Sequence, residues 1–180
     1  MKTNSAEDST RPDRPIQSWL VPLRALFRLS RMLSHRIRLG KKLSVGSNVF
    51  FGPGCVLNPP GFIRLGNDVA IGAGFYLEAN LAVGDGVLFS SHVSIVGNDH
   101  RFEDRDRNVF WAGRLPPATV EIEGDNLIGH GVLVVGNVRI GRGCIVGAGS
   151  VVTRDLPPYK ICYGVPAKPR RDRFSPGHSS

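Results

Sequence analysis

Apolar residues recur at every sixth position along most of this chain. The period runs through residues 45–57, 65–95 and 122–152, and these three runs contain fifteen hexads. A glycine follows many of the apolar residues, and a second, weaker apolar series lies two positions before them. A period of six fits neither an α-helix nor a simple strand, whose periods are 3.6 and 2. It predicts a β-solenoid in which each hexad forms one short strand and one corner, with the aliphatic side chain inside.

The interruption of this period is the main functional signal in the sequence. Residues 97–119 are rich in charge, contain Phe102, Phe110 and Trp111, and include two consecutive prolines near their end. Long loops without a pattern are uncommon in compact domains and usually serve a function. We therefore expect a functional loop at 97–119, with His100 at its mouth, directly after the last strand of the second run.

The pattern divides the chain into four segments. Residues 1–15 are polar and contain prolines, which predicts a disordered N-terminus. Residues 16–40 carry apolar side chains at steps of three and four, which predicts an amphipathic basic helix that ends at Gly40. Residues 41–155 form the predicted solenoid with its loop, and residues 156–180 form a basic C-terminal extension. A thin solenoid exposes much surface, so we expect an oligomer.

Much of the net charge of +8 is contributed by the two ends of the chain. Residues 24–42 contain seven Lys or Arg and no acidic residue. Such a cluster attracts phosphates, nucleic acid or an anionic membrane surface, although it is also compatible with a solvated basic face. For the predicted helix we weigh two roles: covering the open first turn of the solenoid and lying on a membrane surface. We favour the covering role, and different faces of the helix can serve both. We expect no nucleic-acid partner.

The cysteines and the hydropathy of the chain indicate in which cellular compartment we expect the protein. Cys55, Cys144 and Cys162 match no zinc-binding spacing, and Cys144 takes a repeat position as a small buried hydrophobe. No apolar run approaches about 20 residues, and the start of the chain lacks the apolar core of a signal peptide. We expect a reduced, cytoplasmic protein, with peripheral contact at the inner membrane surface through the basic helix as a further option.

Common catalytic motifs are missing from the sequence. Glycines at 141–149 resemble a dinucleotide-binding loop, but their spacing is not G-x-G-x-x-G, and neither a P-loop nor a G-x-S-x-G elbow occurs. Of the five histidines, His35 lies on the predicted helix and His178 in the tail, while His92 and His130 occupy corners that face solvent or an interface. His100 differs because it lies where the last strand of the second run meets the long loop.

The end of the chain carries a resemblance to a known family. Residues 146–158, Val-Gly-Ala-Gly-Ser-Val-Val-Thr-Arg-Asp-Leu-Pro-Pro, followed by Gly-Val-Pro-Ala-Lys at 164–168, resemble the C-terminal signature of hexapeptide-repeat acyltransferases. Over residues 43–173 the chain resembles the branch that contains maltose, galactoside, xenobiotic and polysaccharide-biosynthesis O-acetyltransferases. The resemblance implies a left-handed parallel β-helix of about five turns, assembled as a homotrimer. It also implies acetyl-CoA as co-substrate.

The same resemblance implies roles for individual residues. His100 matches the catalytic histidine, whose neutral imidazole takes the proton of an acceptor hydroxyl as that hydroxyl attacks the thioester. Backbone N–H groups of an opposing turn would hold the developing oxyanion. Asn80 matches an acceptor-binding position, and no metal ligands are expected. Six further residues match positions that contact acyl-CoA: His130, Ala148, Thr153, Arg154, Lys168 and Arg171. Lys168 and Arg171 would face the CoA phosphates, the alternative being a solvated tail.

The sequence leaves several functions open. The preferred acceptor is a sugar or polysaccharide precursor, and the alternative is a xenobiotic hydroxyl, as on an antibiotic, with loop 97–119 deciding between them. A zinc hydratase built on the same helix would need three converging histidines, whereas this chain offers only His92 and His100 nearby. A third class is a non-catalytic trimeric scaffold that binds a partner or a membrane through its basic helix.

Overall fold

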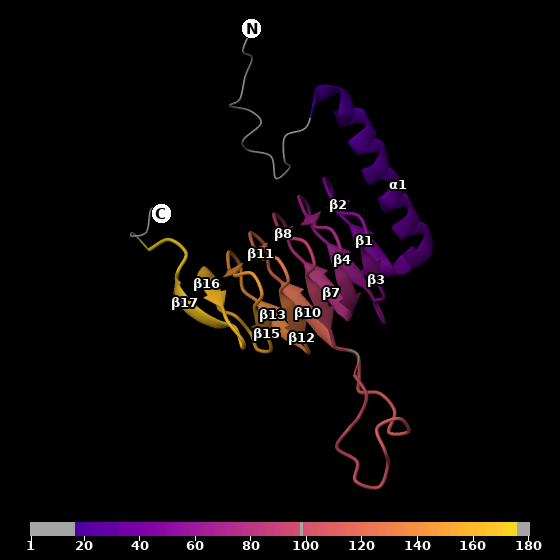
Figure 1. The fold of residues 1–180 in the computed structure, drawn as a ribbon, viewed down its shortest axis with the longest axis vertical. Coiled ribbons are helices and arrows are strands. Elements are labelled where there is room, and N and C mark those ends of the chain that lie inside the picture. Colours follow the sequence, from indigo (N-terminus) through magenta and orange to yellow (C-terminus); the bar gives the residue numbers. More distant parts are fainter. Residues whose placement is uncertain (1–16, 98, 176–180) are drawn as a thin grey trace.

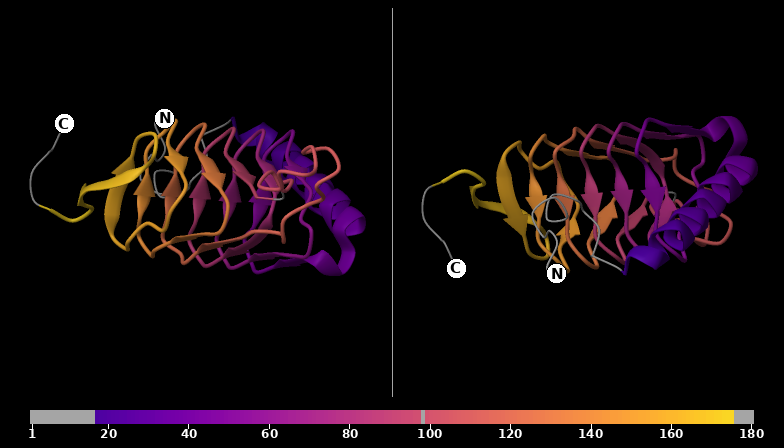
Figure 2. Two further views of the ribbon diagram at one scale, coloured as in Figure 1. Left: turned by 90° about the horizontal axis from the view of Figure 1, so that it is seen from below. Right: turned by 90° about the horizontal axis from the view of Figure 1, so that it is seen from above.

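A computed structural model describes residues 17–97 and 99–175 of the chain, in which short parallel strands wind into a solenoid (Figures 1 and 2). The predicted disordered segment 1–15 and His178 lie outside the described residues. The strands form three sheets, which we call A, B and C. From β1 to β15 each successive strand belongs to the next sheet, so three strands complete one turn. The predicted all-β solenoid is confirmed.

Sheets A and C each contain five strands. Sheet A consists of β1 (Leu43–Val45), β4 (Ile63–Leu65), β7 (Asn80–Val83), β10 (Thr119–Ile122) and β13 (Val138–Ile140). Sheet C consists of β3 (Val56–Leu57), β6 (Tyr76–Glu78), β9 (Ser94–Val96), β12 (Leu133–Val135) and β15 (Val151–Val152). Strands β1 to β15 therefore make five complete turns within the described residues, which is the number that fifteen hexads predict.

Sheet B is longer because the C-terminal extension joins it. Its strands are β2 (Phe50–Phe51), β5 (Ala70–Ile71), β8 (Leu88–Phe89), β11 (Leu127–Ile128), β14 (Ile145–Val146), β16 (Lys160–Tyr163) and β17 (Lys168–Asp172). Strand β16 pairs with β14 in parallel, and β17 pairs with β16 antiparallel. The described part of the basic C-terminal extension thus adds two strands to sheet B.

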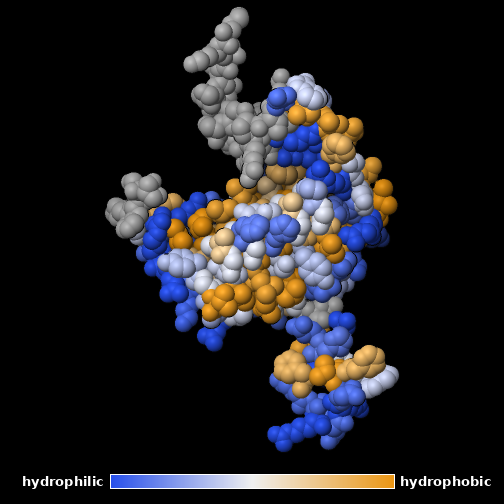
Figure 3. All heavy atoms as spheres, viewed as in Figure 1, coloured by the Kyte–Doolittle hydropathy of each residue, from blue (hydrophilic) through white to orange (hydrophobic). Residues whose placement is uncertain are grey.

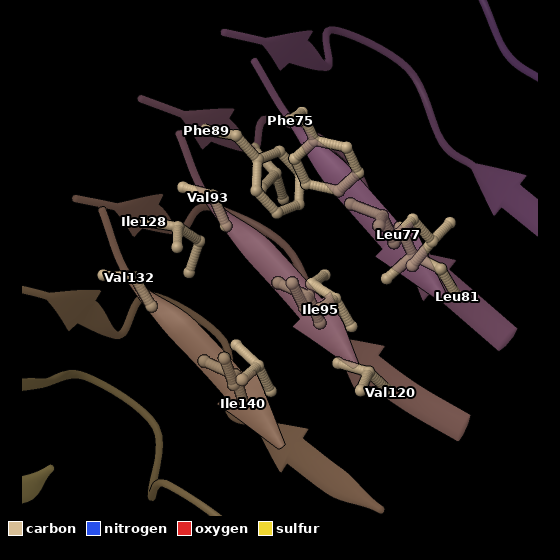
Figure 4. Packing of buried hydrophobic residues seen from close by; sticks show 14 of the residues in the cluster. Phe75, Leu77, Leu81, Phe89, Val93, Ile95, Val120, Ile128, Val132 and Ile140 are labelled. Carbon is tan, nitrogen blue, oxygen red and sulfur yellow. The ribbon is translucent and has the colours of Figure 1, made fainter. Parts of the chain in front are cut away.

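The aliphatic residues of the hexads fill the interior of the solenoid (Figure 4). Both apolar series are buried, as shown by Phe75, Leu77, Val93 and Ile95, each completely inaccessible to solvent. Phe75 and Phe89 of neighbouring turns pack edge to face with ring centroids 5.2 Å apart. Stacked turns therefore share one continuous core, which explains why the period persists through so many repeats.

Two polar residues interrupt the second apolar series and are nevertheless buried. The side-chain amide of Asn126 donates to the carbonyls of Gly141 (2.7 Å) and Cys144 (3.1 Å), and its oxygen accepts from the N–H of Gly124 (2.9 Å). The hydroxyl of Ser150 donates to a corner carbonyl at 2.7 Å. These side chains add hydrogen bonds to backbone groups at the corners, and the N–H of Gly124 finds its acceptor in Asn126.

Glycine at the corners allows the turns to stack closely. A Cβ atom added to Gly72 would lie 2.5 Å from the carbonyl carbon of Ser90 and 2.7 Å from the backbone nitrogen of Ser91. Both distances are far below van der Waals contact, and backbone atoms of the next turn cannot move aside cheaply. The glycine that follows many hexad residues is therefore required by the neighbouring turn.

Helix α1 (Val21–Leu39) covers the first turn of the solenoid and lies between two 3-10 helices, Ser18–Leu20 and Gly40–Lys42 (Figure 1). Gly40 ends α1 with a φ of 52°, and its N–H donates to the carbonyl of Arg36, as the sequence predicted. The guanidinium of Arg31 donates to the carbonyl of Phe51 at 2.9 Å, and that of Arg38 to the carbonyl of Leu57 at 3.0 Å. The covering role is supported by these contacts, which are made by the basic side of the helix.

The loop after β9 projects from the body of the solenoid (Figure 1). Strand β9 ends at Val96 and β10 begins at Thr119, so the structure places the interruption where the hexad period fails. Among the described residues, no helix is both long and apolar enough to cross a membrane.

Candidate active site

His100 lies at the base of the projecting loop and is exposed to solvent. It pairs with Arg114 in an isolated antiparallel bridge. On either side of this pair, the N–H of Arg101 donates to the carbonyl of Gly113 and the N–H of Leu115 to that of Asp99, both at 2.9 Å. The two ends of the loop therefore form a short hydrogen-bonded stem, which holds the backbone of His100 at the edge of the solenoid.

The corner between sheets C and A brings two predicted cofactor residues to the side of the molecule that carries His100. Strands β9, β12 and β15 lie side by side in sheet C in three successive turns. They end at Val96, Val135 and Val152. The loop leaves the first of these turns, and Thr153 and Arg154 occupy the same corner two turns further along. Both side chains are exposed. We call this edge the His100 corner.

The corner between sheets B and C holds the other two cofactor candidates from the repeats. His130 and Ala148 lie in adjacent turns, and the N–H of Gly149 donates to the carbonyl of His130 at 2.8 Å. The Nδ1 atom of His130 lies 2.8 Å from the hydroxyl of Ser91, and the ring of His92 lies edge-on with centroids 5.4 Å apart. We call this edge the His130 corner.

Ser91 is a site residue that the sequence reasoning missed. Residues 73, 91, 130 and 148 occupy the same place in four successive turns, as the pairing of β5, β8, β11 and β14 shows. Aligning the hexads in three columns would have placed Ser91 directly before His130. Beside this pair lies an open hollow of about 520 Å³, which Phe50, Leu88 and Leu127 of sheet B also line.

Within one chain, sheet C separates the two corners. Ala148 and Arg154 are six residues apart, so an extended segment of up to about 20 Å lies between them. The structure therefore brings His100 together with Thr153 and Arg154, and His130 together with Ala148, as two groups.

Lys168 and Arg171 lie on β17, where they extend the outer surface of sheet B. Lys168 is paired with Tyr163 and Arg171 with Ile161, and both basic side chains are exposed. The guanidinium of Arg170 lies 5.2 Å from the centre of the Tyr163 ring. This end of the solenoid therefore presents several cations to solvent, which suits the binding of phosphate groups.

Asn80 has a structural contact in this chain. Its side-chain oxygen accepts hydrogen bonds from the N–H groups of Gly61 (2.8 Å) and Phe62 (3.0 Å) in the preceding turn. The Asn80 side chain thereby stabilises the turn at residues 58–62, which contains Pro59 and Pro60. A role of Asn80 in acceptor binding stays a prediction.

The loop itself encloses a hollow of about 460 Å³. Its lining combines charged and apolar side chains, namely Arg101, Phe102, Glu103, Asp104, Arg107, Ala112 and Leu115. The aromatic pair Phe110 and Trp111 packs edge to face on the same loop, with centroids 4.8 Å apart. Because Arg101 directly follows His100, this hollow is a candidate for the acceptor side of the site.

The described residues contain no group of three or more His, Cys, Asp or Glu side chains arranged to hold a metal ion. His92 and His130 contact each other and Ser91 at one corner, whereas His100 lies at another. The three histidines do not converge on one point, which is the arrangement that the zinc-hydratase alternative would need.

Comparison with known proteins identifies the repeats. Residues 119–154 match the family described as "Bacterial transferase hexapeptide (six repeats)", and residues 42–79 match "Hexapeptide repeat of succinyl-transferase". The galactoside O-acetyltransferase of Escherichia coli is 31% identical over 152 residues, an alignment that covers 77% of this chain and 72% of that protein. This chain belongs to the hexapeptide-repeat acyltransferase family. The left-handed parallel β-helix expected from the resemblance is the fold of this family member.

A further curated relative and one solved structure extend the comparison. The galactoside O-acetyltransferase of Lactococcus lactis is 33% identical over 129 residues, covering 67% of this chain. The chain spans about 60% of the length of two of its curated relatives. Among solved structures, AntD, an N-acyltransferase from Bacillus cereus in complex with dTDP and 3-hydroxybutyryl-CoA, has a TM-score of 0.63 at 23% identity. That alignment covers 74% of this chain and 73% of AntD, and it shows a shared fold.

Proposed function

We propose that this protein transfers an acetyl group from acetyl-CoA to a hydroxyl of a sugar or polysaccharide precursor, with His100 as general base. The observation that carries the proposal is the loop stem, which holds His100 at a solvent-facing edge of the solenoid, on the corner that also carries Thr153 and Arg154. Relatives named galactoside O-acetyltransferases support a hydroxyl on a sugar as the acceptor.

The proposed reaction needs one base and no protein nucleophile. The imidazole of His100 accepts the proton of the acceptor hydroxyl while the hydroxyl oxygen attacks the thioester carbonyl carbon. The tetrahedral intermediate then collapses, the carbon–sulfur bond breaks, and the CoA thiolate leaves with the proton that the imidazole returns. A base placed in this way typically contributes a factor of about 10²–10⁴ in rate.

Acetyl-CoA would be held by the two corners and by the basic end of sheet B. Arg154, Lys168 and Arg171 are exposed cations suited to its phosphates, and Thr153 and Ala148 would contact its uncharged part. His130 and Ser91 form a hydrogen-bonded pair beside a hollow whose lining mixes apolar and polar groups, and the pair offers a polar contact there. The acetyl group must reach His100, so the site needs both corners.

We propose that the protein forms a homotrimer, in which the His100 corner of one copy lies beside the His130 corner of a neighbouring copy. In sheet A the outward-facing row is largely polar or charged: Ser44, Arg64, Ala82, Glu121 and Arg139. In sheet B the corresponding row is apolar in the six parallel strands and ends at Arg171 of β17: Phe50, Ala70, Leu88, Leu127, Ile145 and Ile161. An apolar stripe of this length on a soluble surface favours burial against another copy. A neighbouring copy would then supply the second corner of each site.

Sedimentation equilibrium tests this assembly with matched variants. Leu88→Glu combined with Leu127→Glu places charge in the apolar row of sheet B and should convert a trimer to smaller species. Arg64→Glu makes the equivalent change on sheet A and should leave the mass unchanged. A monomeric wild-type protein would contradict the proposed trimer.

The alternative acceptor is a hydroxyl on a xenobiotic such as an antibiotic. The mixed charged and aromatic lining of the loop hollow accommodates either class. Acetylation of a panel that contains mono- and oligosaccharides together with hydroxylated antibiotics, followed by mass spectrometry, decides between them.

The central experiment measures CoA release with this panel for the wild-type protein and for His100→Ala. We expect the variant to lose at least about a hundredfold in kcat. His35→Gln, which changes a histidine on the inward side of α1, serves as a control for general effects on the fold. Equal rates for wild type and His100→Ala would overturn the assignment of the base. Failure to bind acetyl-CoA in calorimetry, with trimers intact, would instead favour the non-catalytic scaffold.

A further inference from the structure

We propose that helix α1 docks this protein on an anionic lipid surface through its outward-facing apolar side. This side, which we call the outer face, consists of Trp19, just before the helix, and five aliphatic residues: Leu23, Leu26, Leu29, Leu33 and Ile37. Its members are 45–75% exposed. Figure 3 shows hydrophobic atoms gathered on the outside of this part of the molecule. The proposal is independent of the chemistry proposed for His100.

The orientation of α1 is the reverse of that in most globular proteins, whose helices turn their apolar stripe toward the core. The half-buried residues of α1 include Arg28, Arg31 and His35, which recur at steps of three and four and face the solenoid. Arg31 donates to the carbonyl of Phe51, and the guanidinium of Arg28 lies 3.9 Å from the centre of the Phe50 ring. The side that faces the solenoid is thus mainly basic, with Met32 and Leu39 packed against the core, and a second, larger apolar side is left outside.

The reversal has a physical reason in the first turn of the solenoid. Strands β2 and β3 present carbonyl groups that have no preceding turn to pair with. Arg31 and Arg38 of α1 donate to such carbonyls at Phe51 and Leu57, and Lys42, just after the helix, donates to the carbonyl of Pro60 in the turn that follows β3. Apolar side chains could not satisfy these oxygens. The need for donors fixes which side of the helix faces inward.

The positive charge of the segment around α1 favours an anionic surface as the binding partner of the outer face. Residues 17–67 contain eight Lys or Arg and no Asp or Glu. A helix is about 10 Å thick, so the cations on its inner side lie about one Debye length from a surface that the outer face touches. Arg36 and Lys41 are exposed, and Arg36 lies between outer-face positions in the sequence. An apolar stripe on a strongly basic segment is the combination that binds anionic bilayers.

The same charge argues against a second copy of this chain as the occupant. Pairing two outer faces would bring two strongly basic segments together, with no carboxylate in either to compensate. The apolar row of sheet B, in contrast, carries no such repulsion and remains the surface proposed for the trimer. All α1 helices of a trimer with parallel axes would lie at the same end, so their outer faces could engage one surface together.

Vesicle sedimentation tests the proposal with the full-length protein. We expect binding to vesicles of phosphatidylcholine mixed with phosphatidylglycerol, weak binding to pure phosphatidylcholine vesicles, and a decrease in binding as the salt concentration rises. The variant Leu33→Ser with Ile37→Ser should lose about tenfold in affinity, since it removes two apolar side chains from the outer face. Phe174→Ser, at the opposite end of the solenoid, removes an exposed apolar side chain elsewhere and should bind like wild type.

Tryptophan fluorescence locates the contact. The chain has two tryptophans, so Trp111→Phe leaves Trp19 as the only reporter on the outer face. Its emission should shift to shorter wavelength when mixed vesicles are added. Trp19→Phe leaves only Trp111 in the loop, whose emission should not shift.

Each contrary outcome overturns the proposal. Absence of binding to mixed vesicles does so directly, as does equal binding by wild type and the Leu33→Ser, Ile37→Ser variant when both show the same thermal unfolding. A change in oligomer mass caused by this variant, without any vesicle binding, would assign the outer face to a second copy. Acetyl transfer to a soluble acceptor is measured separately, so its failure would leave the vesicle result unaffected.

Discussion

His100 and Arg114 face each other across an isolated antiparallel bridge, at the point where the long loop leaves and rejoins the solenoid. The N–H of Leu115 donates to the carbonyl of Asp99 next to this pair. The general base proposed here thus lies on a loop, but at the part of that loop that the solenoid holds in place. Its position depends on a few backbone hydrogen bonds, because the rest of the loop is exposed.

The first prediction tests that dependence. Leu115→Pro removes the N–H that donates to Asp99, and we expect kcat to fall about tenfold or more while the KM for acetyl-CoA changes little. Leu115→Ala keeps the N–H and should retain distinctly more activity. Because the loop is exposed, the thermal unfolding temperature should be nearly the same for both. Equal kcat values for the two variants would show that the stem does not position His100.

The second prediction separates the structural and the acceptor-binding roles of Asn80. Asn80→Ala removes the acceptor of two backbone hydrogen bonds and should lower the free energy of unfolding by about 1–2 kcal/mol. Asn80→Asp keeps an oxygen in place and should cost less. Steady-state kinetics on Asn80→Asp then reports on the acceptor alone: a raised KM for the acceptor supports contact with it, and an unchanged KM leaves Asn80 with its structural role.

The third prediction concerns the basic end of sheet B. Lys168→Ala and Arg171→Ala each remove an exposed cation from β17, and we expect each to raise the KM for acetyl-CoA about tenfold with little change in kcat. The effect should shrink for a thioester that lacks the nucleotide phosphates, because that substrate has no partner for the cations. The same loss with both thioesters would mean that these residues act on the fold.

The fourth prediction is a pH dependence of stability at the helix. Burial, together with the positive charge of Arg38, lowers the pKa of His35 from its usual value of 6.5. The folded protein therefore binds this proton more weakly than the unfolded chain, so His35 favours folding above pH 6.5 and this contribution is lost as the pH falls toward the lowered pKa. Urea unfolding of wild type and His35→Gln from neutral to acidic pH should show a smaller loss of stability for the variant. Parallel curves would rule out this proton as the cause.

The fifth prediction concerns the buried amide of Asn126. Asn126→Ala removes the acceptor of the Gly124 N–H and one of the donors to each of two carbonyls inside the solenoid, and should lower the free energy of unfolding by about 1–3 kcal/mol. Asn137→Ala is the matched control, since Asn137 is exposed and accepts a single bond from the N–H of Thr119. Its cost should stay below about 1 kcal/mol. Similar costs for the two variants would contradict the importance of burial.

Much of the architecture could be predicted because the hexad period acts locally. An aliphatic residue such as Ile95 or Ile128 must point inward wherever a strand lies against the core, and a glycine such as Gly72 must follow where the next turn comes close. These requirements recur in every turn, so a single sequence displays them many times. The end of α1 at Gly40 could also be predicted from the sequence, because a positive φ at a helix terminus favours glycine.

The polar residues of the core were harder to predict. Asn126 and Ser150 take positions that the apolar series would fill, and only the stacked turns show the backbone groups they satisfy. Strand β16 likewise continues sheet B after the period has ended, because its backbone pairs with β14 and needs no hexad to do so. Backbone pairing leaves little trace in the side-chain pattern.

The sequence by itself determined that this chain winds into a hexapeptide-repeat solenoid, that the winding is interrupted after Ile95, and that His100 stands at the interruption. Only the tertiary structure decided which corners hold the site residues, that Ser91 bonds to His130, and that α1 turns its basic side inward. The physical reason is distance along the chain. Burial of an aliphatic side chain is repeated in every hexad, whereas a contact between turns depends on where residues far apart in sequence arrive after complete turns have been wound.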